Sequence, residues 1–256
     1  MPGTTLFISD LHLCGARPAI TGLFLDFLHR RARASDALYI LGDLFEYWIG
    51  DDAVEQEEFR SVIHGLRELT ASGTPVFVMH GNRDFLMGDG FEKATGGRLL
   101  KDPARIDLYG TPTLLTHGDS LCTDDTEYMT FRAKVRNPAW QKEFLGKSVA
   151  ERNRIVRDFR EISKNSTATK KPEIMDVNQK AVESVMREHR VQRLIHGHTH
   201  RPKEHVFNLD GPPARRMVLG DWYEQGSVLS VDARGWMLEG LPLGKSVKSE
   251  KMKVKS

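Results

Sequence analysis

Short apolar runs recur along the chain, and each is followed directly by polar residues. The clearest run, Ala-Leu-Tyr-Ile-Leu at 37–41, leads into Gly42 and Asp43. A short run without polar alternation, bounded by turn residues, is typical of a strand buried on both faces. Gly42 allows a sharp turn, so we expect Asp43 at the carboxyl end of a sheet, where open α/β folds carry their chemistry. Gly-Asp is also a common turn, so this motif alone decides little.

The same arrangement, an apolar strand followed by polar residues, occurs four more times. These strands are predicted over residues 4–9, 75–79, 113–116 and 191–195. Apolar residues at helical spacing predict helices over 20–33 and 55–71. Strands that alternate with helices indicate βαβ units and a mostly parallel sheet. Two later apolar runs, 217–219 and 228–231, predict short strands of a second sheet.

The strand pattern stops between residues 121 and 190. Helices are predicted there over 126–136, 148–162 and 176–189, separated by Asn137-Pro138 and by a polar loop over 165–172. Because the last strand motif returns afterwards, we interpret residues 121–190 as a mainly helical insertion in one domain that spans 1–240. Residues 241–256 are expected to form a basic, mobile tail, with five lysines from position 245 onward.

The predicted insertion is locally basic. Between residues 132 and 160 the chain has nine lysines and arginines against three acids. A solvated helix face accounts for this pattern. So does a basic amphipathic surface, with Trp140, Phe144 and Leu145 interleaved, that approaches anionic lipid.

Composition narrows the function classes. With 256 residues, 39% hydrophobic and 28% charged, the chain resembles an ordinary soluble globular protein, and its net charge of +2 does not indicate nucleic-acid binding. Two cysteines make no disulfide framework. We find neither a signal region nor a membrane-spanning stretch, so we expect a reducing, cytosolic setting. The absence of a Cys-x5-Arg loop and of a nucleotide phosphate loop leaves a cysteine nucleophile or a nucleoside triphosphatase unsupported.

Seven oxygen or imidazole donors follow the predicted strands: Asp10, His12, Asp43, Asn82, His117, His198 and His200. A lone strand-end histidine is usually a hydrogen-bonded structural residue. Seven such donors at one rim would crowd unpaired polar groups together, and divalent cations would satisfy them at once. Oxygen and imidazole ligands without thiolate favour Mn, Fe or Zn over Mg or Ca.

The spacing of these donors suits two neighbouring cations. In Asp-x-His, alternate residues project to the same side of a strand end, and His198 and His200 have the same spacing. Asp43, on the strand expected beside the first, is the natural bridge because a carboxylate has two oxygens. Water between two cations about 4 Å apart is deprotonated near neutral pH and can attack phosphorus in line.

The motifs Asp-x-His, Gly-Asp, Gly-Asn-Arg-Asp, His-Gly-Asp and Gly-His-Thr-His, in this order between residues 10 and 200, resemble those of the calcineurin-like metallophosphoesterase superfamily. The resemblance implies an α/β (α+β) sandwich of two mixed β-sheets flanked by helices, here with a helical insertion cap. It implies a first metal held by Asp10, His12, Asp43 and His200. It implies a second metal held by Asp43, Asn82, His117 and His198.

The third motif departs from the usual superfamily form, because Arg83 replaces a histidine. That histidine is a candidate for protonating an alkoxide leaving group. Arg83 cannot do so at neutral pH, but its guanidinium can bind phosphate oxygens. A phosphate monoester, with a second pKa of about 6, needs little protonation as a leaving group. The change therefore favours a phosphoanhydride substrate, unless Arg83 is only a structural partner of a nearby acid.

Three segments, 44–52, 81–85 and 173–178, resemble the UDP-2,3-diacylglucosamine hydrolases of the lipid A pathway, and the similarity extends to about residue 240. It implies attack of water on the α-phosphorus, with release of UMP and 2,3-diacylglucosamine 1-phosphate, and two Mn²⁺ per chain. The implied catalytic residues are Asp43, Asn82, Arg83, His117 and His198. The implied substrate contacts are Asn82, Arg83, Asp125, Tyr128, Ser163, Thr167, Lys170 and His198.

The insertion residues also fit such a substrate chemically. Lys170 can meet a phosphate, and Ser163 and Thr167 offer hydroxyl donors, although Thr167 stands where the family leads us to expect Asn. An ordinary polar linker is the alternative interpretation. The apolar sides of the insertion helices could shield two acyl chains, and their basic outer face could rest on the membrane. We therefore expect a monomeric, peripheral protein on the cytoplasmic face of the inner membrane.

Two other functions compete with this one. A two-metal phosphoesterase for cyclic nucleotides or phosphoproteins is disfavoured by Arg83 and by the helical insertion. A non-catalytic scaffold with a phosphoesterase fold is disfavoured because such a protein should have lost metal ligands, and all seven are present.

Overall fold

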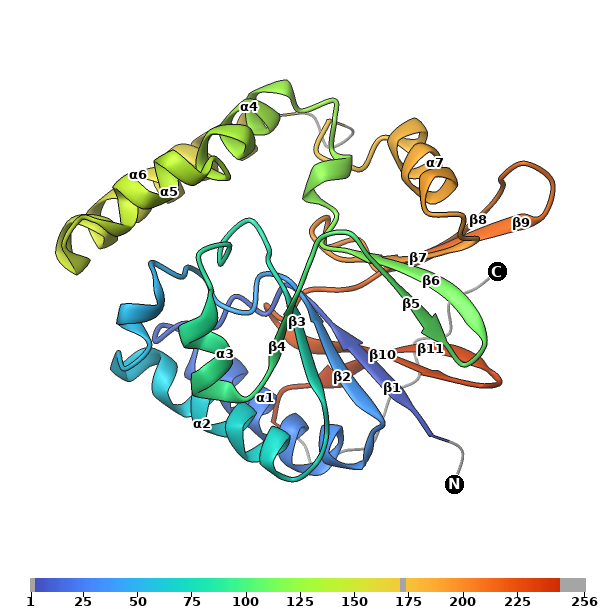
Figure 1. The fold of residues 1–256 in the computed structure, drawn as a ribbon, viewed down its shortest axis with the longest axis horizontal. Coiled ribbons are helices and arrows are strands. Elements are labelled where there is room, and N and C mark those ends of the chain that lie inside the picture. Colours follow the sequence, from blue (N-terminus) through green and yellow to red (C-terminus); the bar gives the residue numbers. More distant parts are fainter. Residues whose placement is uncertain (1–2, 171–173, 245–256) are drawn as a thin grey trace.

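The computed structural model of the chain describes residues 3–170 and 174–244, with their side chains except those of residues 164–169. The strands are β1 (Thr5–Ile8), β2 (Ala37–Leu41), β3 (Val76–Met79), β4 (Arg98–Leu100), β5 (Ala104–Leu108), β6 (Thr111–Thr116), β7 (Arg193–His196), β8 (Lys203–Asn208), β9 (Pro213–Val218), β10 (Gln225–Asp232) and β11 (Gly235–Pro242) (Figure 1). The helices are α1 (Pro18–Arg30), α2 (Glu57–Ala71), α3 (Asp89–Thr95), α4 (Thr126–Val135), α5 (Pro138–Leu145), α6 (Val149–Thr169) and α7 (Gln179–Glu188). Short 3-10 helices are η1 (Ala32–Ala34), η2 (Asp51–Ala53) and η3 (Asp119–Leu121).

The strands form two mixed sheets. The first has the order β11-β10-β1-β2-β3-β4 and the second the order β5-β6-β7-β9-β8. In the first sheet β1 to β4 run parallel, and β10 joins β1 in antiparallel orientation. In the second sheet β6, β7 and β9 run parallel, with antiparallel strands β5 and β8 at the edges. The predicted α/β sandwich of two mixed sheets flanked by helices is confirmed.

Alternation of side chains along the strands creates the layers. Ile8 of β1 packs in one cluster with Phe24 of α1. The adjacent Phe7 points to the opposite face, where it packs with Ile195 of β7 in the core between the sheets. On the outer face of the second sheet, Met186 of α7 packs in a third cluster. The resulting order of layers is α/β/β/α, because successive residues of a strand face opposite sides.

One predicted strand belongs to a different sheet from the one expected. The run at 228–231 lies in β10, which pairs with β1 in the first sheet through the register Thr5↔Val231, whereas the run at 217–219 overlaps β9 of the second sheet. An apolar run is suited to burial in either sheet, so its composition does not identify its partner. The five donor-bearing strands are likewise divided, with β1, β2 and β3 in the first sheet and β6 and β7 in the second.

The helical insertion between β6 and β7 is present. Helices α4, α5 and α6 extend together beyond one side of the two sheets, and α7 lies beside β7 (Figure 1). We call α4, α5 and α6 the cap. Helix α5 was not predicted, because Asn137-Pro138 reads as a break, whereas Asn137 caps the new helix and Pro138 opens it.

Helix α6 is longer than predicted. It begins with a capping box formed by Ser148 and Glu151 and continues to Thr169. Residues 165–169 of the predicted polar loop are therefore helical, and residues 171–172 lie outside the described residues. No glycine or proline interrupts this stretch before Pro172. The predicted lysine tail, from residue 245 onward, lies outside the described residues.

Candidate metal and phosphate site

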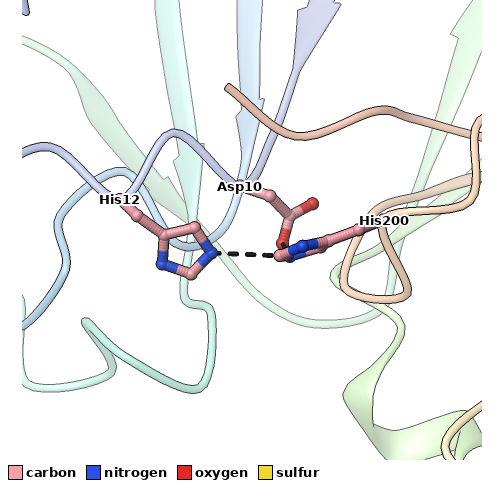
Figure 2. Close-up of side chains that lie close together, drawn as sticks. All are labelled: Asp10, His12 and His200. Atoms are coloured by element: carbon pink, nitrogen blue, oxygen red, sulfur yellow. Dashed lines mark hydrogen bonds and ion pairs between the residues drawn. The ribbon is translucent and has the colours of Figure 1, made fainter. Parts of the chain in front are cut away.

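The predicted donors converge where the loops after β1, β2, β3, β6 and β7 meet. Ligand atoms of Asp10, His12 and His200 lie within 4.8 Å of one another. The Nε2 atoms of His12 and His200 are 3.5 Å apart, and Asp10 Oδ1 lies 3.3 Å from His200 Nε2. Figure 2 shows the two rings pointing toward each other edge-on, beside the Asp10 carboxylate. Residues from two different sheets thus create one compact donor group.

The remaining donors continue this group on the side of Asp43. Asp43 Oδ2 lies 3.8 Å from His12 Nε2 and 3.9 Å from His117 Nε2, between the two rings. Asn82 Oδ1 lies 3.0 Å from His117 Nε2 and 2.9 Å from His198 Nδ1. Ligand atoms of Asp10, Asp43 and His117 also lie within 4.8 Å of one another. The structure therefore brings all seven predicted donors together, and Asp10 borders both groups.

The backbone turns sharply at these residues. Five of the seven donors have positive φ angles: Asp10, His12, Asp43, His198 and His200. This left-handed region is uncommon for residues other than glycine, and Asp and His tolerate it better than most. Such a conformation costs on the order of 1–3 kcal/mol and is concentrated at functional sites. The observed strain is therefore independent support for a site at this position.

Two glycines allow the loops to approach closely. A Cβ atom on Gly81 would lie 2.0 Å from Asp43 Oδ1, and one on Gly197 would lie 2.4 Å from Asp10 Oδ2. Both distances are far below contact distance, so a side chain at either position would displace a proposed ligand.

Burial and charge shift the ionisation of these groups. Burial opposes ionisation of Asp10, but the neighbouring imidazoles, first His200 and then His117 and His12, together outweigh it and lower the pKa of the carboxyl. Burial raises the pKa of Asp43 to about 7, against the effect of His117. The imidazole of His117 is itself buried, but the charge of Asp43 raises its pKa to about 9. Burial lowers the pKa of His198 to about 4, so this ring is neutral at pH 7.

The residues fit a divalent cation. Asp10 Oδ1 is buried and accepts no hydrogen bond from any of the described residues. Carboxylate, amide and imidazole donors without thiolate form a ligand set typical of transition metals such as Mn, Fe and Zn. The lone pairs of this set converge within the span that one or two cations would occupy.

A cavity of about 320 Å³ lies between the cap and the loops after β2 and β3. Six predicted substrate residues line it: Asn82, Arg83, Asp125, Tyr128, Ser163 and Lys170. His198 lies next to it, because its ring centroid is 5.8 Å from that of Tyr128. Thr167 lies in α6, but its side chain is outside the described residues. Apart from Thr167, the predicted substrate residues therefore surround one continuous space.

Arg83 has an unpaired guanidinium group beside the donor group. Its Nε is buried and makes no hydrogen bond to the described residues, among which we also find no acidic partner for its side chain. Its backbone nitrogen donates to Asp43 Oδ1 at 2.8 Å, and its carbonyl accepts from Trp48 at 3.1 Å. These contacts fix the main chain and leave the side chain able to bind an anion, which disfavours the purely structural interpretation.

Lys170 is already paired. Its Nζ donates to both carboxylate oxygens of Asp125 at 2.7 and 2.8 Å, and Glu127 lies 3.3 Å away. Asp125 also caps α4 by accepting from Tyr128 N at 3.0 Å. The pair therefore joins the end of α6 to the start of α4 and closes one wall of the cavity.

The basic surface of the cap is smaller than predicted. Four of its nine basic residues turn toward the body of the protein, with Arg132 bound to Asp119, Arg136 to the carbonyl of Gly81, Arg152 to Asp52 and Arg160 to Glu46. Lys134, Lys142, Arg154 and Arg157 are exposed, and Lys147 is half-buried. Charge counted along the sequence did not distinguish anchoring residues from surface residues.

Several residues of the site were not predicted. Asp84 accepts hydrogen bonds from the nitrogens of Gly81 and Leu44, and it lies within a motif that the sequence already offered. Tyr223 stacks on His12 with ring centroids 5.3 Å apart, but no motif surrounds it. Glu46 lies within the family-specific segment 44–52, yet its partner Arg160 is far away in sequence. Only the first and last of these carried a sequence signal.

Comparison with known proteins agrees with this geometry. A family model described as calcineurin-like phosphoesterase matches residues 3–202. A protein of Pseudomonas aeruginosa (strain UCBPP-PA14) is 51% identical over 242 residues, which cover 94% of this chain and 100% of the relative. A protein of Xanthomonas campestris pv. campestris (strain B100) is 51% identical with the same coverage, and one of Stenotrophomonas maltophilia (strain K279a) is 50% identical over 93% of this chain and 98% of the relative. All three are named UDP-2,3-diacylglucosamine hydrolase.

Proposed function

The chain belongs to the calcineurin-like phosphoesterase family, and from that premise we propose that it hydrolyses the pyrophosphate bond of UDP-2,3-diacylglucosamine in lipid A biosynthesis. Water attacks the α-phosphorus, and the products are UMP and 2,3-diacylglucosamine 1-phosphate. The observation that carries the proposal is the guanidinium of Arg83, which has no partner among the described residues and lines a largely apolar cavity beside seven converging donors.

The proposed cofactor is a pair of Mn²⁺ ions. Asp10, His12, Asp43 and His200 would hold the first, and Asp43, Asn82, His117 and His198 the second. When bound, such a pair lowers the pKa of water and polarises a phosphoryl group, so no protein nucleophile is needed. The position of Asp43 Oδ2 between His12 and His117 supports its role as the shared ligand.

The chain itself contributes binding, orientation and charge. Arg83 binds the non-bridging phosphate oxygens with its permanently charged, planar group. Asn82 Oδ1 lies within 3.0 Å of a nitrogen of His117 and of a nitrogen of His198, which supports the joint role of these three residues as ligands of the second metal. The leaving group is a phosphate monoester, which departs without protonation. No general acid is therefore assigned.

The apolar part of the cavity supports a lipid substrate. Its walls include aliphatic and aromatic side chains from the cap and from the loop after β3, namely Phe85, Leu86, Phe131, Phe144, Val156 and Phe159. The ring centroids of Phe131 and Phe159 are 5.2 Å apart, so α4 and α6 pack together at this wall. Acyl chains placed there would be removed from water at a gain of about 0.8 kcal/mol per methylene group.

We further propose that the cap contacts the cytoplasmic face of the inner membrane. Ile162 is 65% exposed and Leu145 41% exposed, and exposed basic residues such as Arg157 lie on the same helices. Apolar side chains beside basic ones favour an anionic lipid surface. Among the described helices, none has the length and apolarity needed to cross a bilayer. One chain supplies every residue of the proposed site, which supports action as a monomer.

The decisive experiment incubates purified protein and Mn²⁺ with UDP-2,3-diacylglucosamine in ¹⁸O-labelled water. We expect UMP that carries the label, which locates the attack on the α-phosphorus, and no reaction when a chelator is present. Absence of UMP together with efficient hydrolysis of a simple aryl phosphodiester would favour the competing phosphoesterase function. Arg83→Ala should reduce turnover of the lipid substrate strongly, and unchanged turnover would exclude the phosphate-binding role of this residue.

A further inference from the structure

Glu46 is a buried acid on the wall of a cavity that is proposed to hold an anionic substrate. It follows β2 by five residues, is 7% exposed and lines the cavity. Its backbone nitrogen donates to the carbonyl of Leu13 at 3.1 Å, which fixes its position beside the loop after β1. Burying a carboxylate costs free energy. Its negative charge would also repel an anionic substrate. Its presence therefore requires specific partners.

The two carboxylate oxygens of Glu46 face different segments. Oε2 lies 3.4 Å from His12 Nδ1 and 3.9 Å from a guanidinium nitrogen of Arg17. Oε1 accepts a hydrogen bond from Arg160 of α6. The carboxylate thus lies between a proposed metal ligand and a helix of the cap, with cations on both sides to compensate its charge.

His12 requires a partner at this nitrogen. Its Nε2 faces the donor group, and its buried Nδ1 has no hydrogen-bond partner among the described residues. A histidine that binds a metal through one nitrogen generally donates the other N–H to a carboxylate or carbonyl, which fixes the ring orientation and strengthens the ligand. The Glu46 oxygen at 3.4 Å is placed to accept this hydrogen bond after a small adjustment.

The face of the His12 ring is also held. Tyr223 stacks on it at an interplanar angle of 10°, and the guanidinium of Arg17 lies 4.8 Å from the Tyr223 ring centroid. Stacking restrains the tilt of the imidazole but does not decide which nitrogen carries the proton. Glu46 is positioned to supply that second restraint.

We infer that Glu46 is a positioning residue that orients His12 toward the first metal, and that Arg160 ties this orientation to the cap. The inference rests on the proposed metal centre and assigns to a cap residue an effect on metal affinity. Removal of Glu46 should lower the affinity of the protein for one of its two metal ions. Removal of Arg160 should lower the affinity for the same ion to a smaller extent.

In the test, Mn²⁺ is titrated into metal-free protein without substrate, and electron paramagnetic resonance measures the concentration of unbound Mn²⁺. We expect Glu46→Ala to lower the affinity for one Mn²⁺ ion by about 10–100-fold and to leave the affinity for the other unchanged. Glu46→Gln, which keeps an oxygen acceptor and the side-chain shape, should retain most of the affinity and guards against a folding defect of the alanine variant. Excess Mn²⁺ should restore kcat of Glu46→Ala, as expected for a residue that acts through the metal.

A matched control is Glu239→Ala. Glu239 is a buried acid paired with an arginine, Arg31, but it lies on β11 and contacts no proposed ligand. The Glu239→Ala variant should be less stable than wild type but should bind both Mn²⁺ ions with wild-type affinity. For Arg160, the control is the exposed Arg157→Ala on the same helix.

The role of Glu46, the role of Arg160 and the proposed substrate are each contradicted by a different result. Wild-type affinity for both ions in Glu46→Ala overturns the positioning role, and wild-type affinity in Arg160→Ala overturns the link to the cap. A wild-type protein that binds two Mn²⁺ but releases no UMP contradicts the proposed substrate and leaves the assignment of Glu46 standing on the metal titration.

Discussion

The buried carboxylate of Asp84 accepts a hydrogen bond of 2.8 Å from the backbone nitrogen of Leu44, so the turn after β3 holds the loop after β2 in place. Its other oxygen accepts from Gly81 N, also at 2.8 Å. Because Leu44 directly follows Asp43, this contact sets the path of the chain at the proposed bridging ligand. The spacing of two ligand loops thus depends on an acid whose own oxygens are occupied by backbone donors.

Replacement of Asp84 should therefore destabilise the protein. Asp84→Ala leaves three buried N–H groups, those of Leu44, Phe45 and Gly81, without their acceptor, at a cost of about 1–3 kcal/mol for each. Urea unfolding monitored by circular dichroism measures the loss. Asp26→Ala is the control, because its ion pair with Arg30 lies on the surface of α1, where such pairs contribute little to stability. Equal unfolding midpoints for Asp84→Ala and wild type would show that these hydrogen bonds do not stabilise the fold.

Asp43→Ala should affect both proposed metals. Because its carboxylate lies between His12 and His117, its loss should disturb both positions and reduce kcat by on the order of 1000-fold, the equivalent of several kcal/mol of transition-state stabilisation. Elemental analysis gives the metal content, and circular dichroism reports the fold, which should remain. Asp124→Ala, at an exposed acid before α4, serves as the control. Two tightly bound ions per chain in Asp43→Ala would refute the bridging assignment.

Arg152→Ala should loosen the cap. Arg152 is 1% exposed and donates to Asp52 and to the carbonyl of Ile49, so it anchors α6 to the loop after β2. Because Asp52 is largely exposed, water can solvate it, and we expect a loss of about 1–3 kcal/mol, mainly from the unpaired carbonyl. Limited proteolysis should cut the cap faster, and KM for the lipid substrate should rise. The exposed Arg154→Ala on the same helix should change neither, and equal behaviour of both variants would argue against the anchor.

The stability of the protein should depend on Cys122 at alkaline pH. Burial and the charge of Asp119 raise the pKa of this thiol from 9.0 to about 12. Above pH 9 the unfolded chain releases the thiol proton before the folded chain does, so the stabilising contribution is lost as pH rises, by up to about 1.4 kcal/mol per pH unit. The unfolding free energy of wild type relative to Cys122→Ala should therefore fall between pH 8 and pH 10.

A thiol reagent supplies an independent check at pH 8. Cys14 is partly accessible and should react, whereas Cys122 is buried and should react only in denaturant. Rapid labelling of both cysteines in the native protein would contradict the burial on which the pH prediction depends.

The strands and metal donors could be predicted because both leave local signals. The run at 37–41 became β2 without change of bounds, since a strand buried on both faces needs an uninterrupted apolar sequence. His117 and His198 could be grouped because each follows such a run within three residues. The chemical type of these donors then restricts the metal ions that are expected, without knowledge of the fold.

Other features depend on contacts between distant segments. Glu46 and Arg160 are 114 residues apart in sequence, and only packing of α6 over the loop after β2 makes them neighbours. The placement of β10 beside β1 likewise depends on which edge of the first sheet remained open. Neither the charge of a residue nor the hydrophobicity of a strand specifies its partner.

The division of the donors between two sheets bears on the order of events in folding. β1, β2 and β3 deliver Asp10, His12, Asp43 and Asn82, while β6 and β7 deliver His117, His198 and His200. The full set of metal donors is therefore assembled only when the two sheets have docked. Contacts across such long sequence separations form slowly. Metal uptake during refolding should therefore report the final docking of the sheets, and neither sheet alone should acquire the full centre.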